Sequence, residues 1–232
     1  MFHIAQREFI DSFKSIRSIL IILFITFVSY QSANFLYENQ EFVSELIDIG
    51  ESEGAIYSLA TTFIFIVFGF LFVFAISHNV INKELELKTI RLLVTKVSRI
   101  DIVVGKLIGM LLFWISIILV TYGIIFLFAP ANYLRELSET VVLFFYIVTF
   151  VLFMSTIITK SLLSMFLGVF LSIIFPILGL LSTVFDKWYF ILFKYILPFY
   201  YLDNVTFHLV FPVLIGCLFI ILAITVMERR DF

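Results

Sequence analysis

Charged residues and cysteine are scarce in this sequence. Charged side chains make up 14% of the 232 residues, while 62% are hydrophobic and phenylalanine alone contributes 31. Soluble domains are about half apolar and about one quarter charged, so the composition indicates an integral membrane protein. The single cysteine, Cys217, lies within an apolar run, which excludes an intrachain disulfide and offers no metal site.

The sequence also lacks the motifs of common catalytic and cofactor sites. The Gly105-Lys106 pair is followed by leucine and has no upstream glycine at the spacing of a phosphate-binding loop. His3, His78 and His208 are scattered without metal-ligand spacing, and no G-x-S-x-G is present. We therefore predict no catalytic residue, metal or cofactor in this chain. Its net charge of -2 says nothing about nucleic acid, but the two signs are separated by membrane side rather than clustered for a polyanion, and we expect no nucleic-acid partner.

Long apolar runs predict six membrane spans, each close to the roughly 20 residues that cross a bilayer. The expected spans cover residues 18–35, 58–77, 108–128, 141–158, 162–183 and 207–227. The first run is not followed by a small-residue cleavage site, so we expect it to be retained. The expected fold is an all-α integral membrane protein in which residues 1–232 form one transmembrane domain.

The distribution of positive charge predicts the orientation of these spans. With both ends inside, three of the 15 Lys and Arg residues fall on the outer side, namely Arg135, Lys187 and Lys194. This asymmetry follows the positive-inside rule and predicts cytoplasmic termini in a cell membrane. The centres of the spans carry no Asp, Glu, Lys or Arg, which disfavours proton-driven transport.

Residues 1–17 form an amphipathic pattern. One face is apolar and carries Phe2, Phe9, Phe13 and Ile16, while the opposite face carries Arg7, Asp11, Lys14 and Ser18. Such a helix lies in the membrane interface rather than crossing it. The alternative is a frayed polar N-terminus.

Two segments on the outer side have distinct compositions. Residues 36–57 contain six Asp or Glu and no Lys or Arg. Phe42, Leu46 and Ile49 at helical spacing favour a short amphipathic helix there, and the alternative is a flexible loop. Residues 183–206 are rich in aromatic residues but too polar for another span. We expect two short re-entrant or interfacial helices in this second segment, broken at Pro198.

The densest set of cations lies in residues 79–109. Ile81, Leu85 and Leu92 fall on one narrow stripe at helical spacing, with Lys88 beside it. This pattern predicts a short amphipathic cytoplasmic helix at about 82–94, with a break near 95–97. The alternative is a charge-rich loop that only sets the topology.

The end of this segment carries a helix-start signal. Ser98 and Asp101 have the spacing of an N-cap followed by an acid three residues later. We expect a helix to begin there and to run directly into the third span. Gly105 and Gly109 lie four residues apart, a spacing that allows close backbone packing.

The same segment resembles the cytoplasmic segment between the second and third helices of ABC-2-type permeases, the membrane subunits of type V ABC exporters. The resemblance is carried by Glu84, Lys88, Thr89, Leu92, Leu93, Ser98, Arg99, Gly105, Lys106 and Leu107. The sequence departs from the usual family pattern by carrying Leu87-Lys88 where a glycine is common.

The resemblance implies roles for several segments. Residues 1–17 would be the family's elbow helix, with Arg7, Phe9 and Phe13 in its usual start, and 82–94 would be a coupling helix. The ATPase contacts would be Glu84, Lys88, Arg91 and Leu92. The family's outer turn before its last helix would include Pro198, Phe199 and Tyr200.

The implied function is a permease subunit of an ATP-driven exporter. ATP and Mg would bind to two copies of a separate ATPase, and the permease would form a homodimer or a heterodimer within the lipid bilayer. The uncharged, Phe-rich spans favour a hydrophobic or amphipathic cargo, of which a peptide is one example. The rival hypotheses are a stand-alone secondary carrier or channel, and a membrane scaffold that transports nothing.

Overall fold

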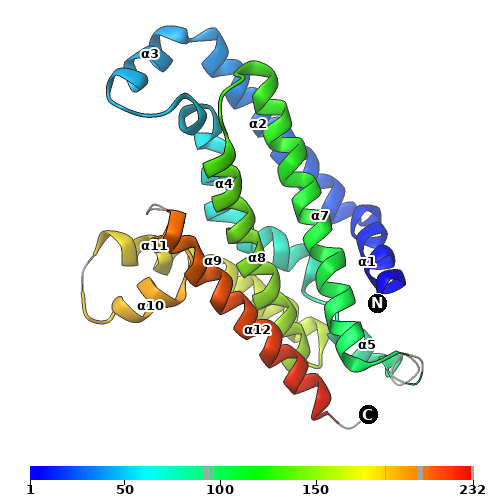
Figure 1. Cartoon of the computed structure of the whole chain (residues 1–232). Coiled ribbons are helices and arrows are strands. Elements are labelled where there is room, and N and C mark those ends of the chain that lie inside the picture. Colours follow the sequence, from blue (N-terminus) through cyan, green and yellow to red (C-terminus); the bar gives the residue numbers. More distant parts are fainter. Residues whose placement is uncertain (91–94, 96, 186, 203–205, 231–232) are drawn as a thin grey trace.

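The computed structural model describes residues 1–90, 95, 97–185, 187–202 and 206–230, and the regular elements in these ranges are all helices (Figure 1). Six of these helices are long and apolar enough to cross a membrane. They are α2 (Ile16–Glu38), α4 (Glu53–Ser77), α7 (Arg99–Phe128), α8 (Leu134–Ile157), α9 (Ser161–Val184) and α12 (Val210–Glu228). The predicted all-α fold with six candidate spans is confirmed.

The spans pack through large aromatic side chains. Helix α4 contacts α2, α8 and α9, while α12 lies along α8. At the centre, the Phe144 ring of α8 lies 5.1 Å from the Phe65 ring of α4 and 4.8 Å from the Trp114 ring of α7, measured between centroids. All three side chains are fully buried. The phenylalanines that the composition shows in excess therefore fill the contact between neighbouring spans.

The two ends of the bundle carry different elements. Both chain termini, α1 (Phe2–Lys14) and α5 (Asn82–Glu86) lie at one end, which we call the terminal end, and α3 (Gln40–Asp48) lies at the other (Figure 1). This arrangement is the one that six spans with both ends on one side require. The short helix expected in residues 36–57 is present as α3.

The buried side of α3 differs from the predicted one. Val43 is buried and Leu46 packs against the core, but Phe42 and Ile49 are exposed. The apolar stripe of α3 is therefore centred one residue away from the predicted stripe. The helix packs against α2 and α4, and those neighbours rather than its own largest side chains determine which face is covered.

Helix α8 begins earlier than expected. The fourth span was predicted to begin at residue 141, whereas α8 starts at Leu134. The Asn132 side chain accepts a hydrogen bond from the Leu134 backbone N–H at 3.1 Å, and Arg135 pairs with Glu139 one turn along at 2.9 Å. These local contacts stabilise the first turns of the helix although the residues are polar.

The aromatic segment before α12 contains the two short helices that were predicted. Helix α10 (Ile191–Ile196) and α11 (Phe199–Leu202) are separated at Leu197-Pro198, and the 3-10 helix η1 (Thr206–Leu209) follows. Phe199 is buried against α9, where a Cβ on Gly179 would lie 2.0 Å from its ring. The glycine therefore makes room for Phe199. The neighbouring Tyr200 ring lies 4.9 Å from the Lys194 ammonium.

Candidate functional site

The N-terminal helix α1 packs closely on α7 at the terminal end. A Cβ added to Gly109 would lie 2.7 Å from both the Ala5 carbonyl oxygen and the Glu8 Cβ, and one added to Gly105 would lie 3.1 Å from Ile4 Cβ. The close contact predicted from the two glycines is confirmed, and α1 is the helix that makes it.

The face of α1 that meets the protein is only partly the predicted apolar face. Phe9 packs against the core, and the Phe13 ring lies 4.8 Å from the Phe113 ring of α7. Phe2 and Ile16, however, are each 76% exposed. Arg7 is exposed and pairs with Asp11 at 3.5 Å. The contact depends on the small Ala5 and the two α7 glycines, because only small residues let two helix backbones come this close.

Helix α5 is shorter than the helix predicted at 82–94. It ends at Glu86 and is followed by a turn in which Lys88 has a φ of 56°. This left-handed conformation is costly for a residue with a side chain and easy for glycine. The turn falls at the position where the resembling family commonly has glycine. Arg91 and Leu92 lie outside the described residues.

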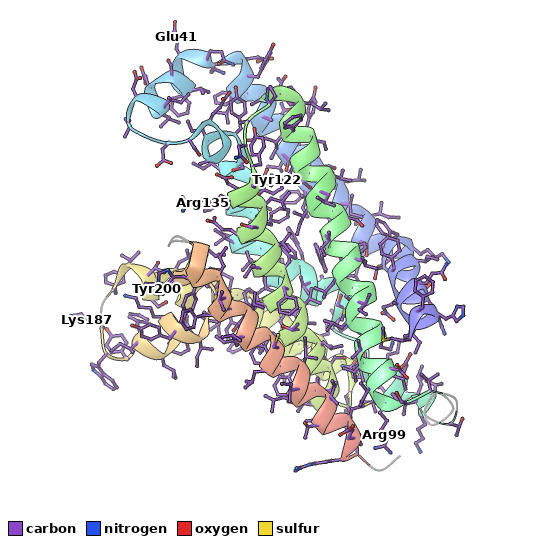
Figure 2. All side chains as sticks on the ribbon, viewed as in Figure 1. Glu41, Arg99, Tyr122, Arg135, Lys187 and Tyr200 are labelled. Atoms are coloured by element: carbon purple, nitrogen blue, oxygen red, sulfur yellow. The ribbon has the colours of Figure 1, made fainter. Side chains whose placement is uncertain are left out.

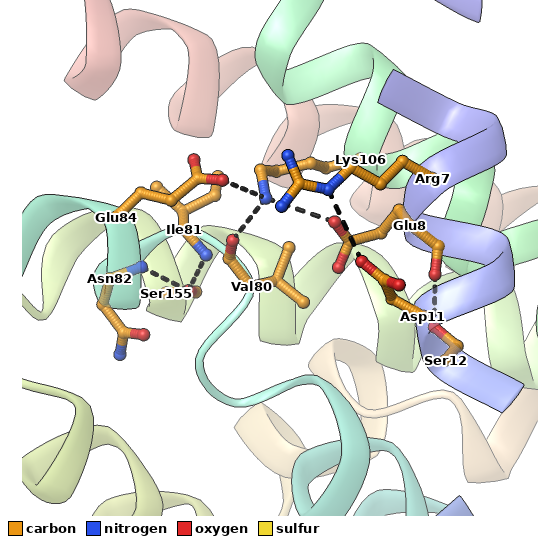
Figure 3. Close-up of polar contacts among 10 residues, drawn as sticks. All are labelled: Arg7, Glu8, Asp11, Ser12, Val80, Ile81, Asn82, Glu84, Lys106 and Ser155. Carbon is orange, nitrogen blue, oxygen red and sulfur yellow. Dashed lines mark hydrogen bonds and ion pairs between the residues drawn. The ribbon is translucent and has the colours of Figure 1, made fainter. Parts of the chain in front are cut away.

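Lys106 joins three segments of the chain at one buried point (Figure 3). Its ammonium lies 3.0 Å from the Glu84 carboxylate of α5 and 3.2 Å from the Glu8 carboxylate of α1, and it donates to the Val80 carbonyl at 2.7 Å. The Lys106 side chain is 6% exposed. An ammonium has three N–H donors, and here each has an acceptor.

Helix α5 is also held to α8 and α9. The Ser155 hydroxyl of α8 accepts from the backbone N–H groups of Ile81 at 2.9 Å and Asn82 at 3.2 Å (Figure 3). The Glu86 carboxylate accepts from the Ser161 backbone N–H at 3.0 Å, at the first residue of α9. A carboxylate at a helix N-terminus is favoured by the unsatisfied N–H groups and by the helix dipole.

Two arginines connect further helix ends at the same end of the bundle. Arg99, labelled in Figure 2, donates to the Met227, Glu228 and Arg230 carbonyls that follow from the end of α12. Arg230 in turn donates to the Ile157 carbonyl at the end of α8, at 3.2 Å. Cations at helix C-termini satisfy free carbonyl groups, and their charge interacts favourably with the negative end of the helix dipole.

A large groove opens beside these contacts. It has a volume of about 920 Å³ and lies between α1 and the segment that joins α4 to α5. Arg7, Lys83, Glu84 and Lys106 contribute to its walls. Lys83, Glu86 and Lys88 are exposed on the surface of this region, while Glu84 faces inward to Lys106. Below this surface, the contacts join α5 to α7, α8 and α9, and through Lys106 to Glu8 of α1.

Most of this cluster was not predicted from the sequence. Glu84, Lys88 and Lys106 were named among the residues that carry the family resemblance, but Glu8, Glu86 and Ser155 were not. The signal that was available is the position of Lys106 beside Gly105, on the stretch of α7 that packs against α1. Among the described residues, no group of three or more His, Cys, Asp or Glu could hold a metal ion.

The comparisons with known proteins concern the same part of the chain. A model of a protein family described as "ABC-2 family transporter protein" matches residues 2–187. The matched range includes α1, α5, Lys106 and Ser155. A search of curated proteins finds no match to the chain.

Proposed function

The chain belongs to the ABC-2 transporter family, and we propose that it is the permease subunit of an ATP-driven exporter in which α5 is the coupling helix. Membership of the family implies a multi-pass membrane protein that works with an ABC ATPase. The proposal adds that α5 receives the movement of the ATPase, and that the contacts of Lys106, Ser155 and Glu86 transmit this movement to the spans.

The observation that carries the proposal is the position of α5. A helix of five residues is too short to be stable alone, and α5 is held by Lys106 of α7 and Ser155 of α8. Its Glu86 also binds the first residue of α9. A displacement of α5 therefore acts directly on α7, α8 and α9, and on α1 through the pair that Lys106 forms with Glu8. A loop that only set the topology would not need these contacts.

The orientation proposed for the chain follows from charge. Helix α5, which contains Lys83, lies at the end that also holds both termini (Figure 1), and Arg99 lies at the same end (Figure 2). The positive-inside rule favours the cytoplasm for that end, where an ATPase has access to ATP and Mg. The exposed Lys83, Glu86 and Lys88 would then face the ATPase, while Glu84 would act through Lys106.

The cargo proposed is hydrophobic or amphipathic, and a peptide is one example. The spans present apolar side chains and contain no charged residue at their centres, so a small ion would be poorly stabilised along them. Six spans form half of a pathway in the proposed assembly. A second permease, either another copy of this chain or a relative, would complete it together with two ATPase subunits.

The first test is a pull-down of the tagged chain from mild detergent, followed by mass spectrometry. We expect a P-loop ATPase at equal stoichiometry, and a second permease band would identify a heterodimer. Recovery of the chain alone, also after crosslinking in intact membranes, would contradict the proposal. Transport by the purified chain without an ATPase would instead establish a stand-alone carrier, and ATPase turnover indifferent to cargo would indicate a scaffold.

A further inference from the structure

A second cavity lies within this single chain, in the half of the bundle nearer to α3. Its volume is about 300 Å³, at the lower end of the range for small-molecule sites. Its walls come from the first half of α4, the start of α8, the end of α9, and α11. In Figure 2 the labelled Arg135 marks the start of α8, on the side of the bundle where α10 and α11 lie.

Most of the wall is apolar. Phe65 and Ile66 of α4, Leu143 of α8 and Phe199 of α11 supply much of it. Phe199 reaches this position because Gly179 leaves room for its ring. The helices that form the cavity therefore pack closely around it, and an apolar chain placed there would be removed from water on several sides.

The polar groups of the wall are the hydroxyls of Thr62, Thr140 and Thr183 and the carboxylate of Glu139. Thr140 and Thr183 donate their hydroxyl hydrogens to the Glu136 and Leu180 carbonyls at 2.8 Å each, so these two hydroxyls present lone pairs to a ligand, and Thr140 also faces the Tyr122 hydroxyl at 3.0 Å. The Thr62 hydroxyl has no hydrogen-bond partner among the described residues and can donate or accept. Among the described residues that line the cavity, Glu139 is the only charged one, and an ionised carboxylate only accepts.

The charges around the cavity favour a cationic ligand over an anionic one. Arg135 pairs with Glu139 but is itself 64% exposed and does not line the cavity, whereas the Glu139 side chain is 16% exposed. A carboxylate can accept from more than one donor, so an ammonium group can join this pair. The segment 36–57 on the same side carries six acids and no Lys or Arg. Cations are therefore attracted to this side and anions repelled.

We propose that this cavity binds amphipathic primary amines, with the apolar chain between α4, α8 and α11 and the ammonium at Glu139. Binding of such amines does not depend on the proposed function. Only the interpretation of the bound amine as a cargo rests on it. A bare hydrocarbon would leave the acceptors without a donor, and a fatty acid would place a second carboxylate beside Glu139. An alkylammonium supplies three donors and the opposite charge.

The test uses the full chain alone in phosphatidylcholine nanodiscs and a photoprobe, an alkylamine with a diazirine on its chain. A probe with the same chain and a carboxylate serves as the matched control. Mass spectrometry locates the label. We expect the amine probe to label peptides of α4, α8 and α9 that line the cavity about tenfold more than the carboxylate probe, the factor that one charge-assisted hydrogen bond provides. Equal labelling by both probes would overturn the proposal.

Four variants separate the site from general membrane binding. Glu139→Gln should lower amine labelling about tenfold, and Thr183→Phe should remove it by filling the cavity. Arg135→Gln should retain or raise it, because the competing cation is lost. Glu45→Gln removes an exposed acid on α3 and should leave labelling unchanged. Unchanged labelling in correctly folded Glu139→Gln would contradict the proposal, whatever the pull-down shows about the ATPase.

The amine can come from cargo or from a membrane lipid. Adding phosphatidylethanolamine to the nanodiscs distinguishes the two sources. Competition with the probe would identify a lipid headgroup as the bound amine, and a lack of competition would identify amines without a phosphate. The competition experiment identifies only the source of the amine. Selectivity for primary amines is tested separately, by the two probes and by Glu139→Gln.

Discussion

The two ends of the helical bundle are held together by different kinds of contact. At the terminal end, Lys106 joins carboxylates from two other segments, and Ser155 fixes the start of α5. At the α3 end, Arg135 pairs with Glu139 within the same helix, and a cavity separates parts of α4, α8 and α9. The first arrangement suits an end that moves as one unit. The second suits an end that adapts to a bound molecule.

The largest effect on stability is expected from removing the buried cation, Lys106, at the terminal end. Lys106→Met leaves Glu8 and Glu84 facing each other in a largely buried space, where one carboxylate oxygen of Glu84 already finds no hydrogen-bond partner among the described residues. We expect the folded state to lose on the order of 3 kcal/mol. Transport-coupled ATPase activity should fall with it. Thermal unfolding in nanodiscs and ATPase assays of the complex measure the two effects.

The matched control for Lys106→Met is Lys83→Met. Lys83 is a neighbouring cation of the same groove, but it is exposed, so its loss should change stability by well under 1 kcal/mol. Equal effects of the two substitutions would show that net charge matters and that the buried Lys106 contacts do not.

The second variant tests the close approach of α1 to α7. Gly109→Leu adds a side chain whose first atom already meets Ala5 and Glu8 at 2.7 Å, so α1 must move away. We expect a loss of about 2 kcal/mol, typical of overpacking, and faster proteolysis of α1. Gly123→Leu on the same helix is the control, because a Cβ there meets nothing within 4 Å among the described residues. Similar melting of both variants would argue against the α1 contact.

The spans and helix ends were predictable because their signals are local. A run of about 20 apolar residues identifies a span without knowledge of its neighbours. Ser98 accepts from the Asp101 backbone N–H at 3.1 Å and begins α7, as the spacing predicted. The break at Pro198 was predictable for the same reason, since proline lacks the N–H that a helix interior uses.

The contacts of the cluster were not predictable in this way. Lys106 and Glu8 are 98 residues apart in the chain, and the one local signal, the position of Lys106 beside Gly105, does not identify the partners of Lys106. The end of α5 was missed because lysine seldom adopts a positive φ. The short helix α3 was predicted, but the spacing of Phe42, Leu46 and Ile49 does not give its covered face, because packing against α2 and α4 buries Val43 instead of Phe42 and Ile49.

The third variant weakens the attachment of α5 to α8 without changing charge. Ser155→Ala removes the acceptor of the Ile81 and Asn82 N–H groups, both of which are buried. We expect a loss of about 1.5 kcal/mol and weaker coupling of ATP hydrolysis to transport. Ser116→Ala is the control, since the Ser116 hydroxyl bonds only locally to the Leu112 carbonyl and is exposed. Normal coupling in Ser155→Ala would exclude α8 from the transmission path.

The smallest expected effect concerns Lys88, and it separates backbone strain from contact with the ATPase. Lys88→Gly removes the strain of a left-handed residue and should stabilise the chain by about 1 kcal/mol. Lys88→Asn also tolerates this conformation but, like glycine, lacks the charge. If the Lys88 ammonium binds the ATPase, both variants should form a weaker complex although both fold at least as well as the original chain. Affinity measurements with the purified ATPase check this. Unchanged affinity in both variants would mean that Lys88 serves the turn alone, and that the exposed Lys83 and Glu86 are the contacts to test next.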